Sequence, residues 1–327
     1  MQKFDFLKKN KLERKYNRNI DILNNANVQQ KIGLVLDLNF HLADRWVCAL
    51  TPYLINKLIN DFKCVIIQNQ RDYNRFKNNL DVVISTHPGW SAPFIKYDMK
   101  KQKLKYIIYS DPHNSPEKYQ RYFKENNFSY ILAYYLNPTY FHFKDVAREK
   151  ILHFTWAIPD EFVETGPIEC QNQDYVMIFG GTKGEAYETR NWCRKYPFVK
   201  NFEYSGCENK ALSNKKYFQW LQQFDATIAA GSLASIYRLV LPKYYEIVNA
   251  GCLLFAQEAE DLEVAGFKDS ENCIFFNKQN FENKVKEYLN NKKQYLSIRH
   301  AGRKLILERH TLSKRIEWLK NHINANI

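Results

Sequence analysis

The sequence lacks any apolar run that approaches the ~18 residues of a membrane-spanning helix, and its first residues lack the apolar core of a secretory signal. Its seven cysteines are scattered, with no C-x-x-C pair, and neither cysteine nor histidine shows the spacing of a zinc site. An odd cysteine count, with several cysteines inside apolar runs, is typical of buried thiols in a reducing compartment. We therefore expect a cytoplasmic protein without a bound metal; a peripheral position at the inner membrane face is the alternative.

Two common enzyme motifs are also missing. No serine lies in a G-x-S-x-G elbow, so the sequence offers no hydrolase triad. The glycine turn Gly180-Gly-Thr-Lys-Gly184 has neither the Rossmann nor the Walker spacing, and no resident cofactor is expected. Because the turn follows an apolar run, it could still let the backbone approach a phosphate; a plain turn is the alternative.

What the chain does carry is positive charge. Lys and Arg number 48 against 35 Asp and Glu, which gives a net charge of +13 and a pI of about 9.2. Such a charge bears on partners: it fits an anionic membrane surface, nucleic acid or negatively charged substrates, with a lysine-rich solvated surface as the alternative. Hydrophobic residues make up 45% of the 327 positions, which allows sizeable cores, and the length favours two domains.

The first half of the chain alternates apolar strand patterns with helical patterns. Residues 1–30 form a basic leader in which four apolar residues could line one face of a helix (Phe4, Phe6, Leu7 and Leu12). From residue 31 to 157 the pattern predicts a parallel sheet with helices on both faces. Six strands are expected, at Lys31–Asp37, Cys64–Gln68, Asp81–Ser85, Lys105–Tyr109, Tyr130–Tyr134 and Ile151–Phe154. A loop is expected from Leu38 to Arg45 and a helix from Trp46 to Asn60.

The second half repeats this organisation. Residues 158–174 contain Pro159, Gly166 and Pro167 and are expected to form an interdomain linker. From residue 175 to 327 we expect a second domain that ends in long helices between Tyr295 and His322. Its strands are expected at Tyr175–Phe179, Asn201–Ser205, Ala226–Ala230, Cys252–Ala256 and Cys273–Phe276.

The stretch from Tyr237 to Phe255 is the most informative part of the chain. Pro242 suits a first helical turn, Gly251 is the expected helix stop, and the apolar run after it predicts a buried strand. The cations Arg238 and Lys243 near a helix start suit a diphosphate. Glu246, one turn further, could accept hydrogen bonds from a ribose. An ordinary α/β unit with these side chains in solvent is the alternative.

Three segments, in order, resemble the C-terminal domain of CgeB-like and group 1 glycosyltransferases. They are Val176-Met-Ile-Phe-Gly-Gly-Thr with Tyr187 and Arg190, then Lys243 to Leu254, and finally Ala301-Gly302 with His310-Thr311 and Arg315. The resemblance implies the GT-B fold, an α/β architecture of two Rossmann-like domains facing a central cleft, with the last helix returning to the first domain. It further implies a metal-independent transferase for which a nucleotide sugar is the substrate.

The same resemblance suggests roles for residues of the second domain. Gly180 and Gly181 would form a donor-side loop with Arg190 nearby. Arg238 and Lys243 would neutralise the departing nucleoside diphosphate. Glu246 would bind the donor ribose. Many group 1 enzymes have a second glutamate where this chain has Arg238, and this departure bears on the donor-sugar contact.

Candidate acceptor-side residues follow strands of the first domain. Asp111 and His113 come directly after the fourth strand, where the ligand crevice of an open α/β sheet lies. Asp111 could act as general base for an acceptor hydroxyl, as an inverting transfer requires, and His113 could act there or orient the donor phosphate. A structural turn is the alternative. Four further residues could line the acceptor side, with a sugar stacked on the tryptophan: Asp37, His41, His87 and Trp90.

We therefore expect a GT-B glycosyltransferase that moves a sugar from a nucleotide donor, with UDP the favoured nucleotide, to a hydroxyl of a glycan, a lipid-linked glycan or a surface polymer. Its basic surface would hold it near an anionic membrane or polymer. Two alternatives stay open: a phage-type enzyme that glycosylates modified DNA bases, and a non-catalytic GT-B-like protein that binds a glycan or a partner.

Overall fold

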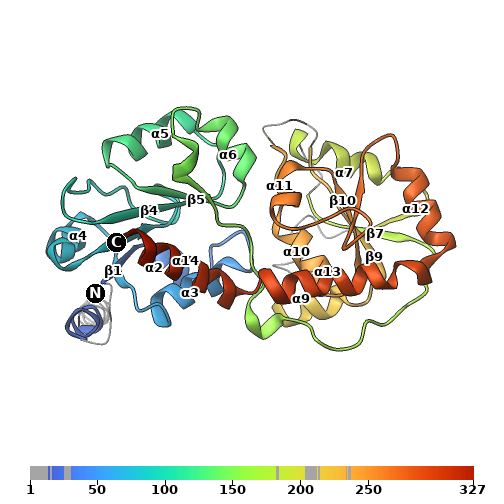
Figure 1. Ribbon diagram of the computed structural model, residues 1–327, viewed down its shortest axis with the longest axis horizontal. Helices are drawn as coiled ribbons and strands as arrows, with labels where there is room; N and C mark the ends of the chain where they lie inside the picture. The colour runs from blue at the N-terminus through green and yellow to red at the C-terminus, as the bar shows by residue number, and fades with distance from the viewer. Residues whose placement is uncertain are drawn as a thin grey trace, which may run out of the picture.

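The computed structural model describes residues 14, 17–25, 31–181, 184–202, 212, 214–232, 234 and 237–327. Two α/β lobes lie side by side, and each is built around its own parallel sheet (Figure 1). This is the architecture expected from the alternating strand and helix patterns.

The first sheet has the strand order β2-β1-β3-β4-β5-β6, and all its neighbouring pairs are parallel. Its strands are β1 (Ile32–Val35), β2 (Val65–Ile67), β3 (Val82–Ser85), β4 (Leu104–Tyr109), β5 (Tyr130–Ala133) and β6 (Ile151–His153). Its helices are α2 (Leu38–Leu42), α3 (Thr51–Asn60), α4 (Gln70–Phe76), α5 (Pro116–Glu125) and α6 (Leu136–His142). Short 3-10 turns are at Lys77–Asn79 and Arg148–Lys150.

The second sheet has the order β11-β10-β9-β7-β8 and is also parallel throughout. Its strands are β7 (Val176–Ile178), β8 (Val199–Asn201), β9 (Ala226–Ala229), β10 (Leu253–Gln257) and β11 (Ile274–Phe276). Its helices are α7 (Glu188–Cys193), α9 (Asn214–Leu221), α10 (Pro242–Asn249), α11 (Glu260–Val264), α12 (Phe281–Asn290) and α13 (Leu296–Arg309). Three more 3-10 turns are at Asp160–Phe162, Glu185–Tyr187 and Lys292–Tyr295.

Both faces of each sheet are covered, which explains the continuous apolar runs. In β1, Leu34 packs into one core and its neighbour Val35 packs into another, and both side chains are fully buried. The core that contains Leu34 continues into the second lobe, where it includes Tyr245 and Leu254. The two lobes therefore share one hydrophobic cluster across their junction.

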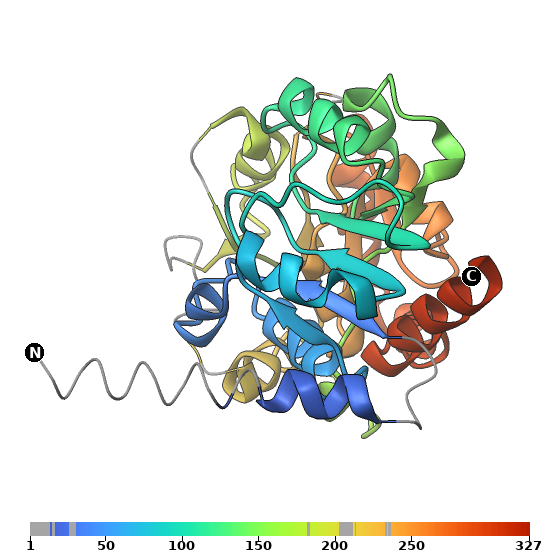
Figure 2. The same cartoon turned by 90° about the vertical axis from the view of Figure 1, so that its left-hand side faces the viewer.

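The last helix, α14 (Leu312–Asn326), lies against the first lobe, as expected for the GT-B fold (Figure 2). Thr311 caps this helix by accepting a hydrogen bond from the Lys314 N–H at 3.3 Å, as its sequence position predicts. Near the end of the helix, His322 Nδ1 lies 3.0 Å from the Tyr106 hydroxyl, which belongs to β4. The last helix thus lies on the first lobe, after the chain has formed the second.

Three local predictions differ from the structure. The expected loop from Leu38 to Arg45 begins with the short helix α2, because Asp37 accepts hydrogen bonds from two N–H groups of its first turn. The helix expected from Trp46 begins only at Thr51, next to Pro52 in its first turn. The strand expected over Asn201–Ser205 is placed earlier, at β8, and residues 203–205 lie outside the described residues.

Part of the basic leader is described. Residues 17–24 are helical, whereas Phe4, Phe6, Leu7 and Leu12 lie outside the described residues. The fully buried Asn19 side chain exchanges two hydrogen bonds of 3.0 Å with the Ile66 backbone on edge strand β2. This contact pairs backbone groups that an open sheet edge would otherwise leave exposed.

Candidate active site

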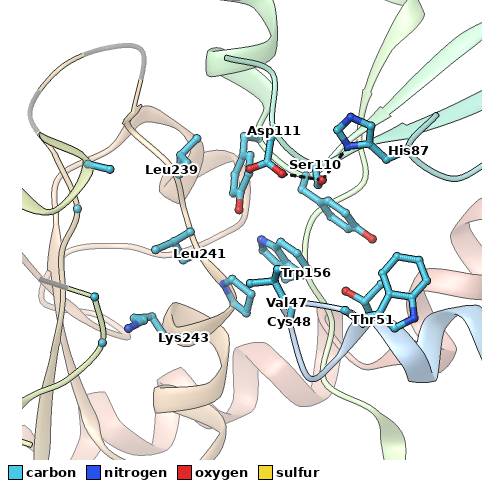
Figure 3. A pocket seen from close by; sticks show the side chains of 18 of the residues that line it. Val47, Cys48, Thr51, His87, Ser110, Asp111, Trp156, Leu239, Leu241 and Lys243 are labelled. Carbon is cyan, nitrogen blue, oxygen red and sulfur yellow. Dashed lines mark hydrogen bonds between the residues drawn. The ribbon is translucent and has the colours of Figure 1, made fainter. Parts of the chain in front are cut away.

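The strand orders locate a crevice in each lobe. In the first sheet the direction of winding reverses between β1 and β3, and in the second sheet it reverses between β7 and β9. Ligands of open α/β sheets bind beyond the carboxyl ends of the strands at such reversals. The loops that follow these four strands line one cavity of about 700 Å³, to which both lobes contribute (Figure 3).

Glu246 lies on the second-lobe wall of this cavity, on helix α10. Its side chain is only 2% exposed, and its Oε2 accepts a hydrogen bond of 2.8 Å from the Tyr217 hydroxyl. Its Oε1 is buried without a hydrogen-bond partner among the described residues. Burial raises the pKa of this carboxyl to about 7, although the Tyr217 hydroxyl and the Lys243 ammonium both act to lower it. The site therefore holds a carboxyl with one unused acceptor oxygen.

Lys243 lies one turn earlier, at the start of α10. Its ammonium donates to the Phe179 carbonyl at 3.1 Å and lies 4.3 Å from the centre of the Phe179 ring. Gly180 follows with a φ of +101°, and a Cβ there would overlap the Lys243 Nζ and come within 3.0 Å of Arg190 Nη1. Glycine is thus needed at position 180 for two reasons: it adopts this positive φ without strain, and it leaves room for the Lys243 and Arg190 side chains beside the turn.

Arg190 is buried behind the glycine turn. Its guanidinium donates to the Ala230 carbonyl at 2.8 and 3.1 Å and to the Gly181 carbonyl at 3.1 Å. The guanidinium carbon lies 4.7 Å from the centre of the Tyr187 ring. These bonds join the loops after β7 and β9, so Arg190 fixes the shape of the wall and adds positive charge to it.

Arg238 lies elsewhere. It is exposed and pairs with Glu260 at 3.8 Å, and it is not among the residues that line the cavity. Its neighbour Tyr237 does line the cavity.

On the first-lobe wall, three side chains form a hydrogen-bonded row. The Ser110 hydroxyl donates to Asp111 Oδ2 at 3.0 Å and lies 3.3 Å from His87 Nδ1 (Figure 3). Since the single hydroxyl hydrogen is used on Asp111, His87 Nδ1 donates and its Nε2 is the acceptor nitrogen. Burial lowers the pKa of His87 to about 4, so the ring is neutral near pH 7.

His113 lies on the same wall but faces the other lobe. Its ring is 5.3 Å from that of Tyr237, which belongs to the second lobe. Its Nδ1 is buried without a hydrogen-bond partner in the described part of the chain. The structure thus brings Asp111 and His113 to one cavity with Lys243 and Glu246, although about 130 residues separate the two pairs along the chain.

Two predicted acceptor-side residues have structural contacts instead. Asp37 caps helix α2. His41 is buried; its Nε2 lies 2.9 Å from Asn56 Oδ1, and its Nδ1 accepts from the Trp46 indole N–H at 3.0 Å. Neither residue lines the cavity, whereas His87 and Trp90 do.

Sequence reasoning missed Ser110, Tyr217 and Tyr237. Ser110 directly precedes Asp111 and could have been found by the same strand-end argument. Tyr217 and Tyr237 carry no local signal, since each acquires its role only through a partner far away in the sequence.

Metal and membrane features are absent from the described ranges. No group of three or more His, Cys, Asp or Glu side chains there could hold a metal ion. None of the helices there is both long and apolar enough to span a bilayer.

Comparison with known structures identifies the fold. HepE from Anabaena, solved with UDP-glucose, superposes with a TM-score of 0.57 at 8% identity, covering 91% of this chain and all of HepE. The lipopolysaccharide outer core galactosyltransferase WaaB gives 0.55 at 11% identity, covering 91% of this chain and all of WaaB. The chain has the GT-B fold. TarM gives 0.52 at 13% identity, with 73% of this chain matched to 54% of TarM, so the alignment spans about half of TarM.

The GT-B match agrees with a sequence comparison of the second lobe. Residues 170–321 match a family described as glycosyl transferase-like. No curated protein matches the chain significantly.

Proposed function

We propose that this GT-B protein is a glycosyltransferase that moves a sugar from a nucleotide donor to a hydroxyl of a glycan, a lipid-linked glycan or a surface polymer. UDP is the favoured nucleotide of the donor. The observation that carries the proposal is the single cavity in which Lys243 and Glu246 of one lobe face Asp111 of the other. The glycosyl transferase-like match over residues 170–321 and the UDP-glucose bound to HepE support the same donor class. The finer CgeB-like resemblance stays a prediction.

The donor diphosphate would lie between the glycine turn and the start of α10. Backbone N–H groups at a helix start attract anions, and Lys243 adds a full positive charge there. Arg190 stabilises the turn from behind. Glu246 Oε1, which lacks a partner in the described part of the chain, would accept a hydrogen bond from a ribose hydroxyl. We propose that these groups, rather than a bound metal, stabilise the leaving diphosphate. The exposed Arg238 would lie outside this site.

The acceptor hydroxyl would lie against Asp111. As its oxygen bonds to the sugar C1, the bond from C1 to the phosphate oxygen breaks and leaves its electron pair on the diphosphate. The hydroxyl proton passes to the Asp111 carboxylate, which the Ser110 hydroxyl orients at 3.0 Å. His113 is the alternative base, because its Nδ1 has no partner among the described residues. Attachment to an anionic membrane or polymer stays a prediction from the net charge of +13.

A nucleotide-release assay tests this function. The purified protein is incubated with UDP-glucose, UDP-galactose and UDP-N-acetylglucosamine plus pooled glycan acceptors, and free UDP is measured. We expect release with one of these donors, and a fall of ~10²–10⁴-fold in Asp111→Asn with unchanged UDP affinity. Asp145→Asn, an exposed aspartate outside the cavity, is the matched control. If no nucleotide binds to the folded protein, the non-catalytic alternative replaces this proposal.

A further inference from the structure

Trp90 forms a rigid, partly exposed surface at the first-lobe wall of the cavity. It is 39% exposed, and its ring packs edge-to-face on Phe40 at 5.3 Å and on Trp46 at 6.1 Å. Trp46 is buried and is itself fixed by its hydrogen bond to His41. Two further rings thus hold an indole in place while part of it faces solvent. His41 therefore supports the Trp90 surface indirectly, by holding Trp46 in place.

The indole lies beside the groups proposed for catalysis. The ring centre of His87 is 5.8 Å from that of Trp90, and His87 is joined through Ser110 to Asp111. A ring resting on Trp90 would therefore have its edge near the acceptor nitrogen of His87 and near the Asp111 carboxylate. Aromatic faces bind flat, weakly polar C–H surfaces while leaving the polar edge of the ligand accessible.

Charge divides the two walls. Among the described residues, the charged side chains on the first-lobe wall are Asp44, Asp111 and Arg45, and the Arg45 guanidinium carbon lies 5.0 Å from the centre of the Phe40 ring. The second-lobe wall contributes the cations Arg190 and Lys243 together with the buried carboxyl of Glu246, whose pKa is raised to about 7. The cations that suit a phosphate are therefore on the donor wall, and an anionic acceptor would meet two carboxylates and a single arginine on the other.

We propose that the acceptor ends in an uncharged sugar residue whose ring stacks on Trp90, with the reacting hydroxyl directed at Asp111. This inference rests on the proposed glycosyl transfer and makes it more specific. It assigns the net charge of +13 to surfaces outside the acceptor wall, and it argues against a nucleic-acid acceptor, whose backbone phosphates would need cations on this wall. His87, with its pKa lowered to about 4, supports the assignment because it adds no positive charge near pH 7.

The test compares binding of the full-length protein to a printed array of neutral, sulfated and phosphorylated oligosaccharides in the presence of UDP. Wild type is expected to bind neutral glycans. Trp90→Ala should weaken that binding roughly tenfold or more through loss of the apolar contact, whereas Trp90→Phe should retain most of it. Phe141→Ala is the matched control, because Phe141 is 42% exposed but does not line the cavity.

The outcomes separate this inference from the function on which it rests. A rise in the melting temperature with UDP shows that the donor site is intact. With that rise present, binding to anionic glycans only, binding to none, or equal binding by wild type and Trp90→Ala overturns the acceptor assignment alone. Without a rise for any nucleotide, the proposed function itself fails.

Discussion

Replacing Glu246 with glutamine should make the protein more stable, and by an amount that depends on pH. The carboxyl is 2% exposed, receives one hydrogen bond from Tyr217, and has an oxygen without a partner among the described residues. Ionising it inside the folded protein is therefore costly. Glutamine has nearly the same shape and resembles the protonated acid, so it removes this cost at every pH.

The size of the effect follows from the pKa of Glu246, which burial raises from 4.5 to about 7. Below pH 4.5 the group is protonated in both the folded and the unfolded chain and has no effect. Between pH 4.5 and 7 the folded chain binds more protons than the unfolded one, so stability falls as pH rises. Above pH 7 the full cost is present, about 3 kcal/mol for a shift of this size.

Urea unfolding of wild type and Glu246→Gln at pH 5 and pH 8 measures this cost. The difference in unfolding free energy should be about 2–3 kcal/mol larger at pH 8 than at pH 5. Glu317→Gln is the control, since Glu317 is exposed on α14 and pairs with Lys314 at 3.8 Å. The control should show no such pH dependence. If Glu246→Gln raises the unfolding free energy equally at both pH values, or lowers it more at pH 8 than at pH 5, ionisation of Glu246 is not the source of the cost.

Three further changes test the site and the junction of the lobes. Tyr217→Phe removes the hydrogen bond to the buried carboxylate, so the midpoint of the pH dependence of UDP-glucose affinity should move above 7; an unmoved midpoint contradicts this. Gly180→Ala should weaken UDP affinity because the new methyl group overlaps the Lys243 ammonium. Gly184→Ala is the control: Gly184 has a φ of +93°, and no atom lies within 4 Å of the new Cβ. This control should cost ~1–2 kcal/mol in stability and leave UDP affinity unchanged. Asp261 on α11 accepts three hydrogen bonds from the first lobe, from the Leu136 N–H and from the backbone and side-chain amides of Asn137. Asp261→Ala leaves these donors without their acceptor and should lower the unfolding free energy by roughly 3 kcal/mol in calorimetry. An unchanged melting temperature would contradict a stabilising role of this contact between the lobes.

Much of the fold could be predicted because a buried parallel strand reads as an uninterrupted apolar run. The runs Asp81–Ser85 and Cys252–Ala256 became β3 and β10 within one residue at each end. Pro242 and Gly251 marked the start and the end of α10, since their backbone preferences act locally. The helix over Leu38–Leu42 was missed because its apolar pattern is short, and its clearest signal was the cap at Asp37.

The sequence located the parts of the site that follow strand ends and the part at the start of α10, where Lys243 and Glu246 line the cavity. Asp111, His113 and His87 follow strands and reach the cavity. The partner of Glu246 could not be predicted, because the hydroxyl that binds it comes from a different helix, 29 residues earlier. Arg238 is close to Glu246 along the chain, and this closeness suggested a shared site. In the structure its side chain instead pairs with Glu260.

Calorimetric titration of the protein with UDP, and then with GDP, CDP and ADP, tests the proposed donor site most directly. UDP should bind wild type and the control Lys304→Ala, which replaces an exposed lysine on α13, with equal affinity. Lys243→Ala should bind UDP roughly ten- to hundredfold more weakly, because it loses a charged hydrogen-bond donor at the diphosphate. Equal affinity of Lys243→Ala and wild type, or no binding of any of the four nucleotides, would contradict the proposed donor site.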